Sequence, residues 1–192
     1  MSLYKDFLEK ILEEHRETLD EFIKREGEKI LRVVELCAQA FRQGRKLLVF
    51  GNGGSAADAQ HLAGELVNRF KMERRPLPAI ALTTDTSVLT AIANDYDFSL
   101  VFVKQIEALG APGDIALGIS TSGNSSNVVL ALKRAKELGL TTVGLSGGLG
   151  GKMPEFCDVL ILVPSSNTPR IQEGHLLFLH IFSELLEKAL FA

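Results

Sequence analysis

The chain has 192 residues, 46% of them hydrophobic, and a formal net charge of −3. This length suits one domain with a sizeable core, and the absence of a lysine or arginine run argues against a nucleic-acid or basic membrane-surface protein. There are two distant cysteines, no apolar run of the roughly 20 residues that span a membrane, and acidic residues early in the chain where a signal peptide would be apolar. Together these features predict a reduced, cytoplasmic protein.

Residues 3–43 are predicted to be helical, because apolar residues recur at three-, four- and seven-residue spacing between charges. Gly27 is predicted to separate two helices, and His15, among charges, is expected at the surface. Two long helices before any strand exceed what a small core needs, so we expect residues 1–43 to pack against another subunit. Residues 44–192 would form the core of a single domain spanning 1–192.

Short apolar runs then alternate with helical patterns. The predicted strands are 46–50, 78–82, 114–120, 141–146 and 158–163, and the predicted helices are 55–70, 86–94, 99–109, 125–138 and 170–190. Strands that are apolar on both faces and alternate with helices indicate a parallel sheet covered on both sides. The fold class is therefore α/β, a doubly wound three-layer α/β/α sandwich with a five-stranded parallel sheet, in which ligands bind at the carboxyl ends of strands.

The first loop at such a strand end is FGNGGSAAD, residues 50–58. Its glycines allow a ligand to approach the backbone, and Ser55 is a candidate N-cap of the next helix. The loop matches neither the dinucleotide fingerprint nor a P-loop. A tight strand-to-helix turn without a ligand is the alternative.

The second loop, ISTSGNSSN at 119–127, is rich in hydroxyl groups and lies between a predicted strand and a predicted helix. A helix start offers free N–H groups and a positive dipole end, which suit a phosphate. Serine also caps helices, but so dense a cluster exceeds what capping requires. The loop therefore predicts a phosphorylated ligand, without ATP because no Walker motif is present.

Ionisable residues form two segments. His61 and Glu65 are four residues apart on the helix after the first loop, so they share a face. His180 lies in an apolar run of the last helix, and His175 is about 140° away around that helix, so the two histidines should not share a site. Gln172 precedes His180 by eight residues, about 12 Å along an ideal helix and some 80° around it, so one site requires an irregular helix start or a ligand that spans both.

Four segments together carry a resemblance: GNGGSAADAQHLAGEL, the ISTSGNS loop, AIANDYDF and RIQEGHLLFLH. In this order they resemble the sugar isomerase (SIS) domain family over almost the whole chain, with its flavodoxin-like fold. The most similar members interconvert sedoheptulose 7-phosphate and D-glycero-D-manno-heptose 7-phosphate, the first step of ADP- and GDP-heptose precursor biosynthesis for surface polysaccharides such as lipopolysaccharide. The resemblance also implies a cytoplasmic homotetramer with active sites between subunits.

The resemblance implies a role for each matching residue. Glu65 and His180 match the catalytic acid/base pair. Substrate- and phosphate-binding positions are matched by Asn52, Gly53, Gly54, Ser55, Asn94, Asp95, Ser120, Thr121, Ser122, Ser125 and Gln172. The zinc site of the family, one Zn²⁺ per subunit, is matched by His61, Glu65, Gln172 and His180. Pro169 is a departure, because members of the family carry an acidic residue there.

These residue types suit aldose–ketose isomerisation, which moves a proton between C1 and C2 through an enediol and needs groups that exchange protons near neutral pH. We expect Glu65 to serve the carbon and His180 the oxygens, or the reverse. Zinc could polarise the enediolate oxygen, although a Glu65 bound to metal would be a weaker base.

Two other functions stay open at this stage. One is a non-catalytic SIS scaffold that binds a replication initiator protein, a branch that NRFKMERRPLPAIAL and LTAIANDYDF also resemble, but which lacks the counterparts of Glu65 and His180. The other is isomerisation of a different ketose phosphate, because the loops do not specify the number of carbons. A sugar-phosphate sensor fused to a DNA-binding module would need a longer chain.

Overall fold

The computed structural model describes residues 2–192, with side chains from Tyr4 onward. Within that range one sheet of five parallel strands has the order β2-β1-β3-β4-β5. The strands are β1 (Leu47–Gly51), β2 (Ala79–Ala81), β3 (Ile115–Ser120), β4 (Thr141–Gly147) and β5 (Val159–Val163). The predicted five-stranded parallel α/β sandwich is confirmed.

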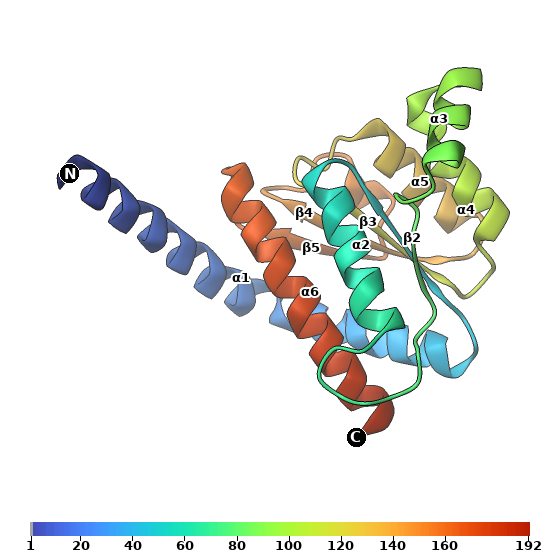
Figure 1. Ribbon diagram of the computed structural model, residues 1–192, viewed down its shortest axis with the longest axis horizontal. Helices are drawn as coiled ribbons and strands as arrows, with labels where there is room; N and C mark the ends of the chain where they lie inside the picture. The colour runs from blue at the N-terminus through green and yellow to red at the C-terminus, as the bar shows by residue number, and fades with distance from the viewer. Residues whose placement is uncertain (1) are drawn as a thin grey trace.

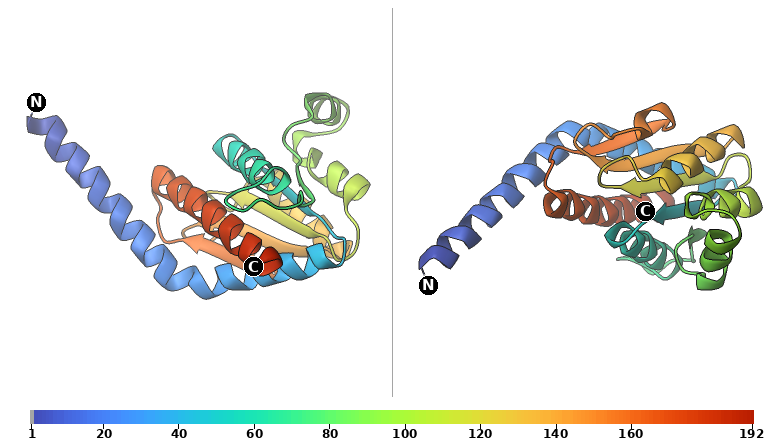
Figure 2. Two further views of the ribbon diagram at one scale, coloured as in Figure 1. Left: turned by 60° about the horizontal axis from the view of Figure 1, so that its bottom comes forward. Right: turned by 90° about the horizontal axis from the view of Figure 1, so that it is seen from above.

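Helices cover both faces of the sheet (Figures 1 and 2). The helices are α1 (Ser2–Arg42), α2 (Gly54–Val67), α3 (Thr86–Asp95), η1 (Phe98–Leu100), α4 (Val103–Leu109), α5 (Ser126–Glu137), η2 (Met153–Glu155) and α6 (Thr168–Phe191). One core cluster joins α1, α2 and α6 to one face of the sheet, and a second joins α4 and α5 to the other, with part of α3 packed against it. No helix in residues 2–192 combines the length and apolar character needed to cross a bilayer.

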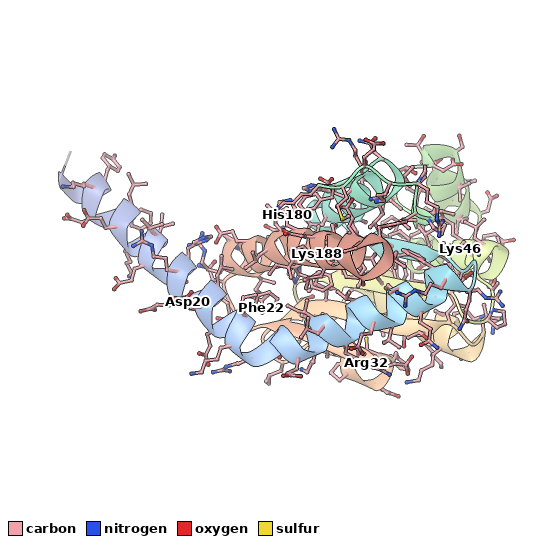
Figure 3. All side chains as sticks on the ribbon, turned by 90° about the horizontal axis from the view of Figure 1, so that it is seen from below. Asp20, Phe22, Arg32, Lys46, His180 and Lys188 are labelled. Atoms are coloured by element: carbon pink, nitrogen blue, oxygen red, sulfur yellow. The ribbon has the colours of Figure 1, made fainter. Side chains whose placement is uncertain are left out.

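The N-terminal region is one 41-residue helix, so the predicted break at Gly27 is wrong. A lone glycine inside a helix costs only about 1 kcal/mol relative to alanine. That cost is outweighed by burial on either side of it, where Phe22 is 0% exposed and Ile30 is 2% exposed. Helix α1 leaves the rest of the molecule near Asp20 and Phe22, and its first half extends away from the sheet (Figures 1 and 3).

The first and last helices of the chain lie side by side (Figure 3). The ring of His15 bonds to the Glu173 carboxylate at 2.7 Å, and Arg170 donates to the Ile11 carbonyl at 3.2 Å. His15 thus lies at the surface, as expected, with a partly exposed side chain that is bonded to Glu173. These bonds attach the projecting part of α1 to the start of α6.

Candidate active site

The site begins where the strand order reverses. Strands β2 and β3 flank β1, so the crevice beyond the carboxyl ends of β1 and β3 is the expected ligand position in this topology. Asn52 follows β1, and Asn127 lies in the first turn of α5 after β3. Their side-chain amides exchange two hydrogen bonds of 2.9 Å. The two loops predicted to bind substrate are thereby joined.

The first loop turns tightly into α2. Gly53 has a φ of +55° and stands at the N-cap position, and α2 begins at Gly54. Ser55 therefore lies inside the first turn, 5% exposed, and the prediction that it caps the helix is wrong. The positive φ of Gly53, which favours glycine, starts the helix two residues earlier than the serine suggested. Asn52, Gly53 and Gly54 line the turn itself.

Two hydroxyl groups of the second loop face each other. Ser120 ends β3 and its hydroxyl lies 3.0 Å from that of Ser125. Ser125 is at the N-cap of α5, yet its side chain forms no capping bond among the described residues. Thr121 and Ser122 lie between them, and Gly123, with a φ of +66°, approaches Gly150 so closely that a Cβ would come within 2.0 Å of the Gly150 carbonyl oxygen. Hydroxyl groups and the start of a twelve-residue helix thus converge at one strand end, an arrangement suited to an anion.

The ionisable cluster forms between α2 and α6, which lie side by side (Figure 1). His61 Nε2 lies 3.0 Å from Glu65 Oε1. The ring of His180 meets the ring of His61 edge-on, with centroids 5.1 Å apart, and stacks on Phe70 at 5.6 Å. Three of the residues predicted for catalysis or metal binding are brought together.

This cluster could hold a metal ion. One ligand atom from each of His61, Glu65 and His180 lies within 4.8 Å of the others. Ligands of a tetrahedral zinc site lie roughly 3.3 Å apart, because each is about 2.0–2.1 Å from the metal, so modest side-chain movement would close the set. Two imidazole nitrogens and a carboxylate oxygen are a donor set that zinc accepts.

Gln172 lies toward the other end of the same two helices. A Cβ on Gly54 would come 2.4 Å from Gln172 Nε2, so the amide lies against the first turn of α2, two turns ahead of His61. Helix α6 is regular from Thr168, so the separation from His180 expected of an ideal helix holds. Gln172 instead borders a pocket of about 410 Å³, which is lined by Gly54, Ala57, Asp58, Pro169, Gln172, Glu173 and Leu176.

Asp58 is a candidate that the sequence reading missed. It borders the pocket beside Gln172, and its Oδ2 is buried without a hydrogen-bond partner in the part of the chain that the structure describes. Burial raises the pKa of this carboxyl to about 6, and the nearby His61 partly opposes the rise. The signal was available, because Asp58, His61 and Glu65 recur at three- and four-residue spacing and so share one face of α2.

Asn94 and Asp95 occupy a different region. Both are exposed near the end of α3, and their side chains bond to each other at 2.9 Å. Across residues 2–192, no side-chain hydrogen bond joins this pair to the two loops. None of the ten residues of α3, all of which the structure describes, is buried. The structure of one chain therefore does not bring this predicted substrate-contacting pair to the loops.

Comparison with known proteins identifies the family. Residues 11–147 match the model of the SIS domain. A phosphoheptose isomerase of Geotalea daltonii is 60% identical over 177 residues, covering 92% of each chain. A phosphoheptose isomerase of Aquifex aeolicus is 52% identical, covering 94% of this chain and 95% of that one.

Solved structures agree with this assignment. A phosphoheptose isomerase from Neisseria gonorrhoeae has a TM-score of 0.91 at 42% identity, covering 96% of this chain and 99% of that one. One from Francisella tularensis has a TM-score of 0.93 at 38% identity, covering 98% and 99%. The chain therefore belongs to the SIS domain family and, within it, to the group of the phosphoheptose isomerases.

Proposed function

We propose that this protein isomerises sedoheptulose 7-phosphate to D-glycero-D-manno-heptose 7-phosphate through an enediol, the first step toward ADP- and GDP-heptose. The observation that carries the proposal is the meeting of Glu65 with His180, beside His61, in a chain 60% identical to a phosphoheptose isomerase. Those two side chains also distinguish this chain from SIS scaffolds without catalytic function.

The hydroxyl-rich loop would bind the phosphate. Ser120 and Ser125 turn their hydroxyls toward each other beside the start of α5, which supplies N–H groups and a positive dipole end. Thr121, Ser122 and Ser55 add donors around the same strand ends. Fixing the phosphate fixes one end of the open-chain sugar and so limits where the reacting carbons lie.

The proton transfers would fall to the carboxylate and the imidazole. Glu65 removes a proton from C1 while O2 receives one, which gives the enediol. The O1 hydroxyl then gives up its proton and C2 receives one, which gives the aldose. His180 serves the two oxygens, a task for which imidazole is suited because it gives and takes protons near neutral pH.

We propose a zinc ion as cofactor, one per subunit, held by His61, Glu65 and His180. Gln172 would be a fourth ligand only after moving from its place beside Gly54. When bound, zinc would supply electrostatic stabilisation of negative charge on a substrate oxygen. The hydrogen bond between His61 and Glu65 holds both side chains at the cluster.

We also propose a homotetramer with active sites between subunits, in which residues 1–43 serve oligomer packing. Support comes from the exposed apolar stripe of Tyr4, Leu8 and Leu12 on the projecting part of α1. It comes also from α3, which carries the exposed pair Asn94 and Asp95 and has no fully buried residue. A neighbouring subunit would bring that pair to a site. The free, unpaired cysteines Cys37 and Cys157 fit a cytoplasmic location.

The test is turnover of sedoheptulose 7-phosphate by the purified protein and by Glu65→Gln and His180→Gln, each with and without added zinc. Both variants should lose activity by roughly a hundredfold or more while keeping the wild-type fold and oligomeric state. Glu35→Gln, on an exposed face of α1, is the matched control and should stay active. A folded wild type that is inert with and without zinc would exclude this reaction, and other ketose phosphates and the scaffold role would be tested next.

A further inference from the structure

Two buried charged side chains hold the link between α2 and β2. The side chains of Arg74 and Glu187 are 1% and 0% exposed and pair at 3.0 Å. The link consists of residues 68–78, which have no regular secondary structure. Burying an ion pair costs desolvation free energy, which good geometry and further hydrogen bonds must offset. The other groups that bond to Arg74 and Glu187 therefore show which segments the pair connects.

Glu187 holds the backbone of the link. Its carboxylate accepts bonds of 2.9 Å from the N–H groups of Phe70, Lys71 and Met72, besides the bond from Arg74. Burial alone would raise the pKa of Glu187, but the three N–H bonds and the charge of Arg74 outweigh it and lower the pKa. The ionised carboxylate thus has four donors, which matches its capacity.

Arg74 attaches the same link to the catalytic end of α2. Its guanidinium donates to the carbonyls of Glu65 and Leu66, each at 2.8 Å, and to that of Asn68 at 3.1 Å. These carbonyls belong to the last turn of α2 and to its C-cap residue Asn68, where a cation is favourable. The backbone of Glu65 is therefore bonded to the residue that pairs with Glu187 on α6.

Phe70 connects the Arg74–Glu187 pair to the cluster of His61, Glu65 and His180. Its ring stacks on that of His180, with centroids 5.6 Å apart and planes 17° apart, and its N–H is bound by Glu187. Glu187 follows His180 by seven residues, so both project from one face of α6. The imidazole of His180 therefore has two aromatic neighbours, Phe70 in a stacked contact and His61 in an edge-on contact.

We propose that Phe70 is a positioning residue, which fixes the orientation of the His180 ring and is itself held by the Arg74–Glu187 pair. The inference rests on the proposed function, in which His180 exchanges protons with the sugar oxygens. The second side-chain torsion of histidine is intrinsically broad, and proton transfer requires a ring held within hydrogen-bond reach of its target. The stacked aromatic face of Phe70 restricts that torsion.

The test compares Phe70→Leu, which keeps apolar volume but removes the aromatic face, with Phe70→Tyr, which keeps it. We expect Phe70→Leu to lower kcat roughly tenfold or more with KM changed less than about twofold, and Phe70→Tyr to retain at least about half of kcat. The matched control is Phe191→Leu. Like Phe70, Phe191 has a ring that lies beneath a cation of the link, in its case Arg75. Phe191 is on α6, as His180 is, but eleven residues away from it. It should keep wild-type kcat.

Equal losses of kcat in Phe70→Leu and Phe70→Tyr, or in Phe70→Leu and Phe191→Leu, would overturn the proposal. So would wild-type kcat in Phe70→Leu.

A second readout is independent of turnover. The chain has four histidines, and the ring signals missing from the NMR spectrum of His180→Gln identify those of His180. Loss of the Phe70 ring current alone displaces these signals, so the readout is their cross-relaxation with the ring protons of His61, whose centroid lies 5.1 Å from that of His180. This cross-relaxation should weaken in Phe70→Leu and persist in Phe70→Tyr and Phe191→Leu. Unchanged cross-relaxation in Phe70→Leu would refute the positioning role even if kcat falls. An inert wild type with the expected change in cross-relaxation would instead refute only the proposed reaction.

Discussion

His175 is a buried imidazole with no charge to pair with. It is 0% exposed on α6, and within residues 2–192 neither ring nitrogen has a hydrogen-bond partner. Burial lowers its pKa to about 4, although the nearby backbone of Ser146 offsets part of the effect. The folded protein therefore keeps this ring neutral at pH values where an unfolded chain would protonate it.

Stability should consequently fall as the pH falls from about 6.5 to about 4, because only the unfolded state takes up the proton in that window. His175→Leu removes this contribution. Between pH 7 and pH 5 the wild type should lose about 2 kcal/mol more unfolding free energy than the variant. Urea unfolding at both pH values measures the difference. Parallel losses in the two proteins would show that the ring is already paired or hydrated.

At the scale of single residues, sequence patterns recovered the members of the cluster but not their neighbours. His61 and Glu65 were placed together by helical spacing alone, and the resemblance added His180. Phe70 could not be added, because its position depends on Glu187, 117 residues later in the chain. Gln172 was assigned by resemblance, and its place beside Gly54 follows from how closely α6 approaches a residue without a side chain.

At the scale of elements, the link between α2 and β2 depends on one carboxylate. Glu187→Gln leaves Arg74 as a buried charge without its ionised partner, and breaking such a pair costs about 3–5 kcal/mol. We expect a loss of that size in urea unfolding. Glu184→Gln is the control, because Glu184 pairs with Lys71 and Lys188 at the surface and its removal should leave stability nearly unchanged. If both variants lost a similar amount of unfolding free energy, burial of the Arg74–Glu187 pair would not be the reason for the cost.

The elements that sequence predicted well are those fixed by local pattern. All five strands were found because runs such as Leu47–Gly51 are buried on both faces and so read as continuous apolar stretches. The predicted helix 55–70 ends at Val67 instead, and the carbonyls of its last turn are bound by Arg74. The predicted helix 99–109 is divided into η1 and α4. Tertiary bonds, which no local pattern contains, set these boundaries.

At the scale of the whole molecule, the projecting half of α1 exposes a stripe of large apolar side chains. Tyr4 is 74% exposed, Leu8 65% and Leu12 47%, and their four-residue spacing forms one stripe. In an isolated chain, an exposed leucine can be replaced at little cost. In the proposed tetramer, the same replacement would bury a charge between subunits.

Leu8→Asp should therefore shift the oligomer toward smaller species while leaving the fold of each chain intact. Light scattering coupled to gel filtration should give the wild type near four times the 20.9 kDa chain mass and the variant well below it. Glu13→Ala, a change at an exposed polar position of the same helix, should keep the wild-type mass. Identical masses for Leu8→Asp and the wild type would exclude this stripe from the subunit interface.

The pairing of α1 with α6 also determines when the molecule can complete its core during synthesis. The two helices are bonded near both ends, by His15 to Glu173 and by Arg42 to the carbonyl of Ala189 at 2.5 Å. Helix α1 thus packs against a helix that lies 158 residues later in the sequence at the bond between His15 and Glu173, and contacts between such distant segments form slowly. Until α6 has been synthesised, the apolar face of α1 around Phe22 lacks part of its cover, so incomplete chains are exposed to aggregation through that face.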